Sequence, residues 1–422
     1  MRQSRGQTKE KIIKISHESL FVGNFFTSLG TLILRVFPEG DRNMEIIEAI
    51  SDTNIGGAGV LLLTRLSADE KMRRRTLVLL PKGSALRERL LAIGVAVAET
   101  TYCADRSFDI RAIPEYIRLI RKNKPHTVNC HGCLSFRIAS FICGVPVRIY
   151  TRHCTFPRRW WQGFRILRAL TGRAQTLLSN GIIAVAEAAR EDLEAMGVPR
   201  DKVCVIINGV SGIKRLDETE RAAIRKTLNI PSDALVVSIF ARLEEYKGHT
   251  DLINAAQILL ERSDRYRFLI VGSGSFENEL KALCEDKNIS ERFIFTGFAP
   301  DVAPYMNITD INVNCSHGTE TSSLALSEGM SIGLVSVVSD YGGNTYMVKD
   351  GENGFVYPVF DAEKLARIIE NIANDGALRE RLSHNARLRF ENELNAKKMT
   401  EETYDYYTAL RSFKISVRSE SP

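Results

Sequence analysis

From Met44 onward, short β-branched runs alternate with longer amphipathic segments. Strands that alternate with helices of about 10–15 residues predict βαβ units and a parallel sheet covered by helices on both faces. Helical patterns cover residues 110–122 and 187–196 of this first series. Its expected strands are residues 46–50, 76–80, 95–98, 127–130, 145–150, 182–186 and 203–207. The pattern predicts an α/β fold.

A turn-forming sequence, Asn208-Gly209-Val210-Ser211-Gly212, interrupts the series before it restarts. The expected strands of the second series are residues 234–240, 267–271, 293–296, 311–314 and 334–338. After residue 361 the pattern is helical to about residue 411. We expect two doubly wound, Rossmann-like domains, residues 44–212 and 213–390, and a C-terminal helix and tail over residues 391–422. Two such domains bind ligands in a cleft between the carboxyl ends of their strands.

The composition is that of a globular protein, with 422 residues, 44% hydrophobic and 26% charged. It excludes a disordered chain, a collagen-like fibre and a small disulfide scaffold. No uncharged apolar run reaches the roughly 18–20 residues of a transmembrane helix. Residues 1–212 carry 32 Lys and Arg against 19 Asp and Glu, whereas residues 213–422 carry 25 against 32. A basic half next to an acidic half suits a first domain that faces nucleic acid, an anionic membrane or an anionic substrate.

The eight cysteines lie mostly in apolar runs, which favours buried thiols in a cytoplasmic protein over a disulfide framework. Cys130-His131-Gly132-Cys133 has the spacing of a redox pair, and His153 with Cys154 would extend it to a zinc site. Both interpretations are weaker than a structural one, because no second cysteine pair follows and the strand pattern already accounts for these positions.

Residues 1–43 differ from the rest of the chain. Basic residues precede an apolar stretch over residues 20–37, which allows a signal peptide or an amphipathic membrane helix. We favour an extension without a role in the fold, with translation starting at Met44. Glu39-Gly40-Asp41 can be encoded by a sequence that contains a bacterial ribosome-binding site at a usable distance from Met44.

The segment from Ser316 to Met330 follows an expected strand and is expected to open a helix near Thr321. Amide groups at a helix start attract anions. Glu320 and Glu328, eight positions apart, are predicted to line one face and to accept hydrogen bonds from sugar hydroxyls. The alternative is a first-turn charge and a solvated helix residue.

Two cations, Arg242 and Lys247, follow an expected strand and are placed to clamp a pyrophosphate. The alternative is a pair of exposed loop cations. Gly272 belongs to a Gly-x-Gly sequence after the next strand, which allows close backbone approach but is weak evidence. A hydride-transfer fingerprint needs a third glycine, and Glu277 stands there.

In the first domain, Gly56 and Gly57 lie between the first strand and the first helix, either as a phosphate-binding loop or as a tight turn. His131 and His153 each follow an expected strand and so are expected to face the cleft.

Both tryptophans lie in one arginine-rich segment. Trp160, Phe164 and Leu167 fall on one helical stripe. Arginine with interfacial tryptophan is typical of a surface that contacts anionic lipid. A core-packing helix and a nucleic-acid stacking surface are the alternatives. The residues proposed for membrane or acceptor contact are Arg158, Arg159, Trp160, Trp161, Phe164 and Arg165, with His131.

Taken together, the motifs resemble the retaining nucleotide-sugar glycosyltransferases of family 4, which have the GT-B fold. The resemblance covers Met44 to about Arg411. In chain order it rests on Gly56-Gly57, Asn208-Gly209-Val210, Arg242 with Lys247-Gly248, Phe295-Thr296-Gly297-Phe298, Glu320-x7-Glu328-Gly329-Met330, Ser339-Asp340-Tyr341-Gly342-Gly343-Asn344 and Asp350-Gly351-Glu352-Asn353-Gly354-Phe355.

The resemblance implies roles for these residues. Arg242 and Lys247 would hold the diphosphate of the donor and stabilise the leaving group, and Glu328 would bind the ribose. Phe298 would lie beside the base, and His153 would lie near the reacting centre with His131 behind it. Donor contacts are also implied for Gly56, Gly57, Gly272, Glu320, Thr321, Ser322, Ser323 and Leu324. The family requires no metal, and its C-terminal helix crosses back to the first domain.

The chain departs from the family pattern at four places. Ala186, Ala241 and Val335 are tolerable replacements. Thr321-Ser322-Ser323 replaces the common Gly-Phe-Gly after Glu320 and changes the expected sugar pocket. The implied activity is transfer of a hexose or N-acetylhexosamine from a nucleotide-diphosphate sugar, most simply a uridine one, to a lipid-linked or polysaccharide acceptor.

The implied location is the cytoplasm, at the inner face of the plasma membrane, in the synthesis of lipopolysaccharide or exopolysaccharide. Nucleic acid is not an expected partner. A non-catalytic GT-B partner subunit and a GT-B sugar-nucleotide epimerase are the alternatives, and an oxidoreductase ranks last.

Overall fold

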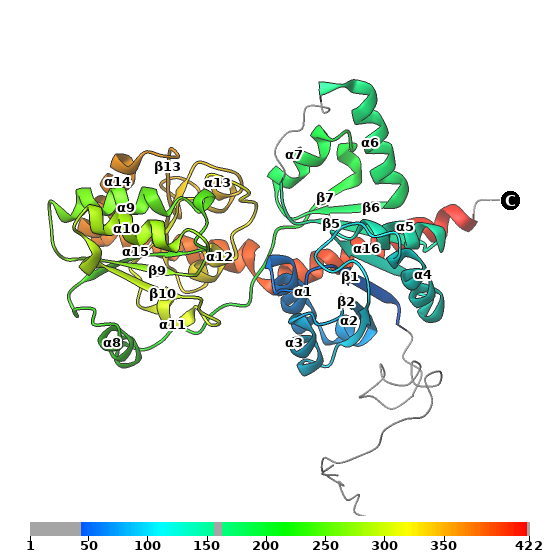
Figure 1. Cartoon of the computed structure of the whole chain (residues 1–422), viewed down its shortest axis with the longest axis horizontal. Helices are drawn as coiled ribbons and strands as arrows, with labels where there is room; N and C mark the ends of the chain where they lie inside the picture. The colour runs from blue at the N-terminus through cyan, green and yellow to red at the C-terminus, as the bar shows by residue number, and fades with distance from the viewer. Residues whose placement is uncertain (1–43, 156–162, 420–422) are drawn as a thin grey trace, which may run out of the picture. The chain divides into compact units, whose positions relative to one another are not determined.

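A computed structural model describes residues 44–155 and 163–419 (Figure 1). These residues form two parallel β-sheets covered by helices, and both sheets lie in one compact unit of the chain. The first sheet has the strand order β3-β2-β1-β4-β5-β6-β7, and the second has the order β10-β9-β8-β11-β12-β13. The expected α/β fold with two Rossmann-like sheets is confirmed.

The elements are as follows. The strands are β1 (Ile46–Ile50), β2 (Thr76–Pro81), β3 (Ala96–Thr100), β4 (Thr127–His131), β5 (Val147–Arg152), β6 (Gly181–Ala184), β7 (Val203–Val205), β8 (Leu235–Phe240), β9 (Tyr266–Val271), β10 (Phe293–Gly297), β11 (Ile311–Asn314), β12 (Val335–Ser339) and β13 (Gly354–Tyr357). The α-helices are α1 (Gly57–Ala68), α2 (Glu70–Arg75), α3 (Leu86–Ala92), α4 (Ala112–Asn123), α5 (Leu134–Ile142), α6 (Arg165–Leu178), α7 (Glu187–Ala195), α8 (Glu218–Thr227), α9 (His249–Leu260), α10 (Glu277–Asp286), α11 (Ala303–Asn307), α12 (Leu324–Ser331), α13 (Asn344–Met347), α14 (Ala362–Asn374), α15 (Gly376–Arg389) and α16 (Ala396–Ser419). Short helical turns are η2 (Arg200–Lys202), η3 (Glu245–Lys247), η4 (Ser290–Arg292) and the π-helical η5 (Phe390–Leu394).

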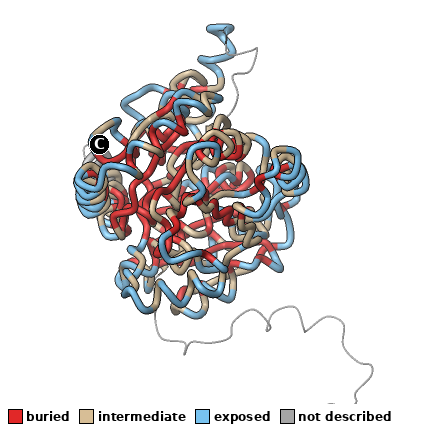
Figure 2. Tube along the Cα trace, turned by 90° about the vertical axis from the view of Figure 1, so that its left-hand side faces the viewer, coloured by how far each residue is buried: buried red, intermediate tan, exposed pale blue. Residues whose placement is uncertain are grey.

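Both faces of the first sheet are buried, and alternate residues of one strand serve different faces. Ile46 and Ile50 of β1 pack in a core with α1, α3 and α16, whereas Ile47 and Ala49 pack in a core with α4 and α5. Side chains of a strand point alternately to its two faces, so a strand buried on both sides reads as a continuous apolar run. Figure 2 shows the buried strands inside and the exposed turns of the helices outside.

The strand register aligns the carboxyl ends that carry the candidate residues. Ile50 pairs with His131, and Cys130 pairs with Tyr150, so β1, β4 and β5 end at one edge of the first sheet. In the second sheet Phe240 pairs with Val271, which brings the loops after β8 and β9 together. Loops at this edge of a doubly wound sheet bind ligands.

The C-terminal helix returns to the first sheet, as expected. α16 contacts α1 and β5 (Figure 1). Met399 and Tyr407 of α16 are buried in the core that also holds Ile46 and Leu62. The core of the first sheet is therefore completed by residues from the far end of the chain.

Several predicted bounds are wrong. The expected helix over residues 361–411 is divided into α14, α15, η5 and α16, because Asp375 caps a new helix and Asn395 leaves the helical conformation. β13 was not predicted as a strand, since its residues were assigned only to a motif. Residues 1–43, with the expectations for Met44 as the start, lie outside the described part of the chain. Within the described part, no helix is both long and apolar enough to cross a membrane.

Candidate active site

The loop after β8 brings two cations to the carboxyl edge of the second sheet. Gly248 ends η3 with φ of 69°, and a Cβ there would lie 2.1 Å from the carbonyl oxygen of Cys315. This close approach sets the loop against the end of β11. Arg242 is exposed and donates to the hydroxyl of Tyr246 at 2.6 Å.

Lys247 reaches the segment ahead of α12. Its Nζ lies 2.7 Å from Oε2 of Glu320, and the two side chains are 16% and 8% exposed. Ser316 also donates to this carboxylate at 2.9 Å. The structure therefore joins two residues that the sequence separates by 73 positions. Lys247, predicted to bind the diphosphate, forms an ion pair with Glu320, predicted to bind the sugar.

A glycine turn supports the backbone around Glu320. The amide of Gly343 donates to the carbonyl of Glu320 at 3.2 Å, and a Cβ on Gly343 would lie 1.5 Å from the carbonyl oxygen of Thr321. Gly342 has φ of 56°, in the left-handed region. The glycines of the Ser339–Asn344 motif thus allow this turn to lie directly against the backbone of Glu320 and Thr321.

The helix opens later than predicted. Ser323 is the N-cap of α12, and its side chain accepts from the amide of Leu326 at 3.4 Å. Thr321 and Ser322 therefore lie before the helix, and Leu324 is its first residue. Glu320 is outside the helix, so the prediction that it shares a helix face with Glu328 is wrong. The helix still directs its positive end toward the segment that carries Glu320.

Glu328 lies in the second turn of α12 in an environment that favours its neutral form. Burial, and then the negative charge of Asp301, raise the pKa of Glu328 to about 7. Asp301 follows Phe298, which is 73% exposed in the loop after β10. Glu328 and the expected base-binding loop are thus neighbours.

The two glycine predictions have different outcomes. Gly272 has φ of 147°, and a Cβ there would lie 2.0 Å from the carbonyl oxygen of Ala241, so this glycine allows the strand ends to pack just before Arg242. Gly56 and Gly57 are exposed at the start of α1, and a Cβ on Gly57 would meet nothing within 4 Å. The fold itself does not require glycine at position 57. The open space beside this residue is large enough for a ligand to approach its backbone.

The predicted histidines contact each other. Nδ1 of His131 lies 2.7 Å from Nε2 of His153, and His131 ends β4 while His153 follows β5. Burial, and then the neighbouring His131 and Arg65, hold the pKa of His153 well below its usual value. A cavity of about 30 Å³ beside both rings has room for a water molecule but not for a sugar.

One hydrogen bond connects this histidine pair to the second sheet. Oγ1 of Thr321 donates to the carbonyl oxygen of His153 at 3.1 Å. Through Thr321, the His131–His153 pair lies next to the segment that holds Glu320 and, with it, Lys247. The structure thus brings His153 next to the segment with Glu320 and Lys247, three of the residues to which the resemblance gives a role in transfer.

Neither cysteine interpretation gains support. Cys130 and Cys133 are free and buried, and Cys130 donates to the carbonyl of Cys133. Burial raises the pKa of both thiols, to about 11 for Cys133. A reactive redox thiol has a lowered pKa. No group of three or more metal-ligating side chains occurs among the residues that the structure describes.

The predicted membrane segment lies only in part within the described residues. Arg158, Arg159, Trp160 and Trp161 fall outside them. Phe164 is the extended N-cap of α6, so the predicted helical stripe through Trp160 and Phe164 is wrong at Phe164. Arg165 begins the helix and is exposed.

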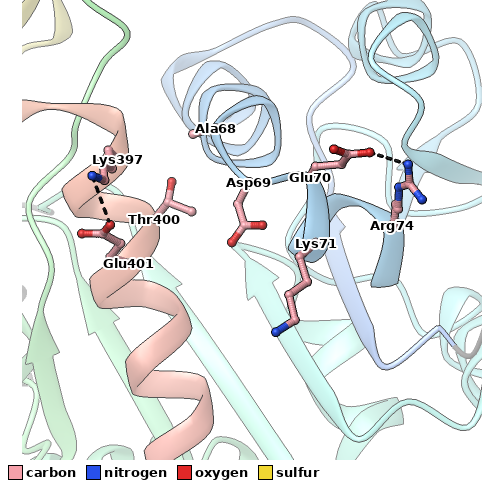
Figure 3. Close-up of a pocket in the computed structure, with 8 residues that line it drawn as sticks. All are labelled: Ala68, Asp69, Glu70, Lys71, Arg74, Lys397, Thr400 and Glu401. Atoms are coloured by element: carbon pink, nitrogen blue, oxygen red, sulfur yellow. Dashed lines mark hydrogen bonds and ion pairs between the residues drawn. The ribbon is translucent and has the colours of Figure 1, made fainter.

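A groove of about 700 Å³ lies elsewhere, between α2 and the start of α16 (Figure 3). Four of its charged side chains form ion pairs, Glu70 with Arg74 and Lys397 with Glu401. Because Ala68 ends α1, this groove borders the amino edge of the first sheet and is not part of the candidate site.

The sequence interpretation missed the residues behind His131. Glu48, Arg65 and Tyr407 form a buried hydrogen-bonded group with this ring. A glutamate within the apolar run of β1 was an available signal, because a buried charge needs a partner. Tyr407 had no local signal, since it lies 359 positions from Glu48.

Comparisons with known families match almost all of the two-sheet region. Residues 55–211 match the model described as glycosyltransferase family 4, and residues 220–389 match glycosyl transferases group 1. One similar relative is the capsular polysaccharide biosynthesis glycosyltransferase CapM of Staphylococcus aureus, 24% identical over 71% of this chain and 80% of that protein. Another, from Escherichia coli, is UDP-Gal:alpha-D-GlcNAc-diphosphoundecaprenol alpha-1,3-galactosyltransferase, 26% identical over 73% of this chain and 82% of that protein.

Solved structures show the same fold. Anabaena Alr3699/HepE in complex with UDP has a TM-score of 0.75 at 20% identity and covers 87% of this chain and 100% of its own. A glycosyltransferase from Rickettsia africae has a TM-score of 0.73 at 18% identity, over 86% of this chain and 98% of its own.

Proposed function

We propose that this chain, which belongs to the family-4 glycosyltransferases of the GT-B fold, transfers a hexose or N-acetylhexosamine from a uridine-diphosphate sugar to a lipid-linked saccharide. It is a transferase whose relatives act in bacterial surface-polysaccharide synthesis. The observation that carries the proposal is the convergence of Lys247, Glu320 and Thr321 with His153 at the carboxyl ends of both sheets.

Departure of the nucleoside diphosphate develops negative charge on its phosphates. Arg242 and Lys247 are placed to stabilise that charge, and the positive end of α12 adds to their effect. Stabilisation of this kind requires no metal, and we propose none. Glu320 and the backbone of residues 321–324 would hold the hydroxyls of the transferred sugar.

The remaining donor contacts follow from the same arrangement. Glu328 would accept hydrogen bonds from the ribose, and Phe298 would cover the base. Gly56 and Gly57 would approach the donor from the first sheet. We infer retention of the anomeric configuration from the family resemblance, and we assign no nucleophile.

Uridine is the base that relatives support. Anabaena Alr3699/HepE was solved with UDP and with UDP-glucose, and the Escherichia coli relative is named for UDP-galactose. The latter also names a diphosphoundecaprenol acceptor, which supports a lipid-linked acceptor for this chain. Since nucleotide sugars are cytoplasmic metabolites, we place the reaction at the inner face of the membrane.

Exposed residues of α6 support contact with that membrane. Ile166, Leu170 and Leu177 are 76%, 58% and 58% exposed, and their spacing puts them on one side of the helix. Arg165 and Arg173 are exposed beside them. Apolar side chains flanked by arginine suit a surface that meets anionic lipid. We therefore extend the proposed membrane face from residues 158–165 along α6.

A ligand screen followed by product analysis tests the function. We expect UDP and one UDP-sugar to raise the melting temperature of the purified protein, and other nucleoside diphosphates to raise it less. Mass spectrometry of a lipid-linked acceptor should then show the added mass of one sugar. Conversion of the nucleotide sugar without transfer would indicate an epimerase, and absence of any nucleotide effect would contradict the proposal.

A further inference from the structure

A buried polar group lies behind the His131–His153 pair and spans four elements. Glu48 of β1 is fully buried and accepts from Arg65 of α1 at 2.6 Å. Tyr407 of α16 donates to Glu48 at 3.0 Å and accepts from Arg65 at 2.9 Å. Asn129 of β4 also donates to the Tyr407 hydroxyl, at 2.8 Å. The hydroxyl has one proton and two acceptor sites, so these contacts satisfy it.

The hydrogen bonds determine which nitrogen of His131 carries a proton. Burial alone would raise the pKa of Glu48, but Arg65 and the hydrogen bonds from His131 and Tyr407 outweigh it and lower the pKa to about 2. An ionised carboxylate only accepts hydrogen bonds. Because Oε2 of Glu48 lies 2.8 Å from Nε2 of His131, that nitrogen must donate.

The same reasoning extends to His153. Nδ1 of His131 faces Nε2 of His153 at 2.7 Å, and a hydrogen bond there needs one proton between the two atoms. In neutral His131 the proton is on Nε2, so Nε2 of His153 must supply the one in between. Nδ1 of His153 is then an acceptor, and it is buried without a partner among the described residues.

We propose that Glu48, held by Arg65 and Tyr407, is a positioning residue that acts through His131 to fix His153 as a neutral imidazole with Nδ1 as its acceptor atom. This inference rests on the proposed function, in which His153 lies at the transfer site. Thr321 fixes the backbone of the same residue from the second sheet. Ring and backbone of His153 are therefore set by different parts of the chain.

The charge on His131 determines which nitrogen of His153 carries its proton. His131 contacts Glu48 from β1, Asn129 from β4 and His153 after β5, and Asp52 after β1 acts on it by its charge. Arg65 from α1 and Tyr407 from α16 act on it through Glu48. A second proton on His131 would donate from Nδ1 to His153 and move the remaining proton of His153 to its Nδ1. An acceptor in the site would become a donor, so the proposed role of His153 requires neutral His131.

Histidine nitrogen NMR of the ligand-free protein tests the assignment. With ¹⁵N-histidine in the full chain at pH 8, we expect His131 and His153 both to carry the proton on Nε2. In Glu48→Gln we expect mixed tautomers, because an amide can donate or accept. A proton on Nδ1 of His153 in the wild type, or unchanged tautomers in Glu48→Gln, would overturn the inference.

Kinetics provide the second readout. A carboxylate that fixes a histidine tautomer contributes up to about 10⁴-fold to catalysis, so we expect kcat of Glu48→Gln to fall at least about 10-fold while KM for the nucleotide sugar stays within about 2-fold. The acid limb of its pH–rate profile should also move. If kcat/KM fell by the same factor through a raised KM, and the pH–rate profile did not change, Glu48 would have a merely structural role and the inference would be overturned.

Tyr407→Phe covers the case in which Glu48→Gln does not fold, because it removes one hydroxyl and leaves the ion pair. We expect a smaller fall in kcat and a shifted acid limb. Tyr116→Phe is the matched control, since Tyr116 is also buried against this sheet and its hydroxyl contacts Cys133. If the wild type shows the expected tautomers but transfers no sugar, the proposed function fails and the tautomer assignment stands, because the NMR reads the resting protein.

Discussion

Lys247 has two effects in the proposed site, one on charge and one on stability. Lys247→Ala should lower kcat about 10²–10³-fold, because one donor to the developing charge is lost. It should also lower the melting temperature, since Glu320 is left buried without its cation. Transfer assays and thermal unfolding measure the two effects.

Lys364→Ala is the control for Lys247→Ala, because Lys364 is exposed on α14. The double variant Lys247→Ala with Glu320→Gln should regain stability without regaining activity, which separates the two effects. Wild-type turnover in Lys247→Ala would remove this residue from the site.

Glu328 gives the nucleotide affinity a pH dependence. Its pKa of about 7 means that the carboxyl group is mostly protonated at pH 6 and mostly ionised at pH 8. Only the ionised form accepts hydrogen bonds from both ribose hydroxyls, so UDP affinity should rise about 10-fold from pH 6 to pH 8 beyond the effect of the phosphate. Calorimetry on wild type and Glu328→Gln measures this, because the phosphate titrates in both. Parallel pH curves would contradict the assignment.

At the scale of the element, the sequence predicted the positions of the strands more reliably than the ends of the helices. Apolar runs located twelve of the thirteen strands of the described residues to within two residues, because a strand buried on both faces leaves a continuous signal. The starts of α6 and α12 were wrong, since caps depend on single side chains such as Ser323. β13 was hidden within a glycine-rich motif.

The candidate site was predictable for residues whose position in the sequence, at or after a strand end, already indicates their role. Lys247, Glu320 and His153 each follow a strand, and His131 is the last residue of one. The topology alone brings such positions together. The relay from Glu48 was not predictable in the same way. Its partners Arg65 and Tyr407 come from helices far apart in the chain, and only tertiary packing reveals which of many arginines and tyrosines reach a buried carboxylate.

The turn at residues 342–343 offers a test of the loop that it supports. A Cβ on Gly343 would lie 1.5 Å from the carbonyl oxygen of Thr321, so Gly343→Ala must displace this backbone. We expect a loss of about 1–3 kcal/mol in stability and a raised KM for the nucleotide sugar. Gly376→Ala is the control, because a Cβ there meets no atom within 4 Å. Equal behaviour of the two variants would contradict the role of the turn.

α6 offers a test of the membrane face. Ile166→Ser with Leu170→Ser removes two exposed apolar side chains from one side of the helix. Co-sedimentation with anionic vesicles should fall several-fold, and binding by the wild type should weaken with added salt. Leu388→Ser is the control, since Leu388 is 41% exposed on α15. Equal binding by all three proteins would exclude α6 as a membrane contact.

At the scale of the whole molecule, α16 connects the two sheets by packing against the first sheet after the second. The first sheet gains part of its core from α16, which follows the second sheet in sequence. The connection after β7 and the segment before α16 also pair with each other, because the amide of Val210 donates to Leu394 and that of Ala396 donates to Val210. The stability of the first sheet therefore depends on residues that follow the second sheet in sequence.

A buried methionine in α16 tests this dependence. Met399 is 6% exposed among residues of the first sheet, and Gly209 donates to its sulfur at 3.3 Å. Met399→Ala should cost about 2–5 kcal/mol. Because the side chain belongs to the core of the first sheet, hydrogen exchange should accelerate in β1 and β4–β6 more than in β8–β13.

The matched substitution lies in the second sheet's region. Met347→Ala removes a fully buried methionine that packs with Leu326 and Val338. Its faster exchange should centre on β12 and α12 and leave β1 protected. If both substitutions accelerated exchange equally in the two sheets, the chain would unfold as a single cooperative unit, and the particular dependence of the first sheet on α16 would be refuted. A loss of exchange protection confined to the first sheet in Met399→Ala would give the opposite conclusion. The hydrogen-bonded group of Glu48, His131 and His153, which uses Tyr407 of the same helix, would then form only when α16 has docked.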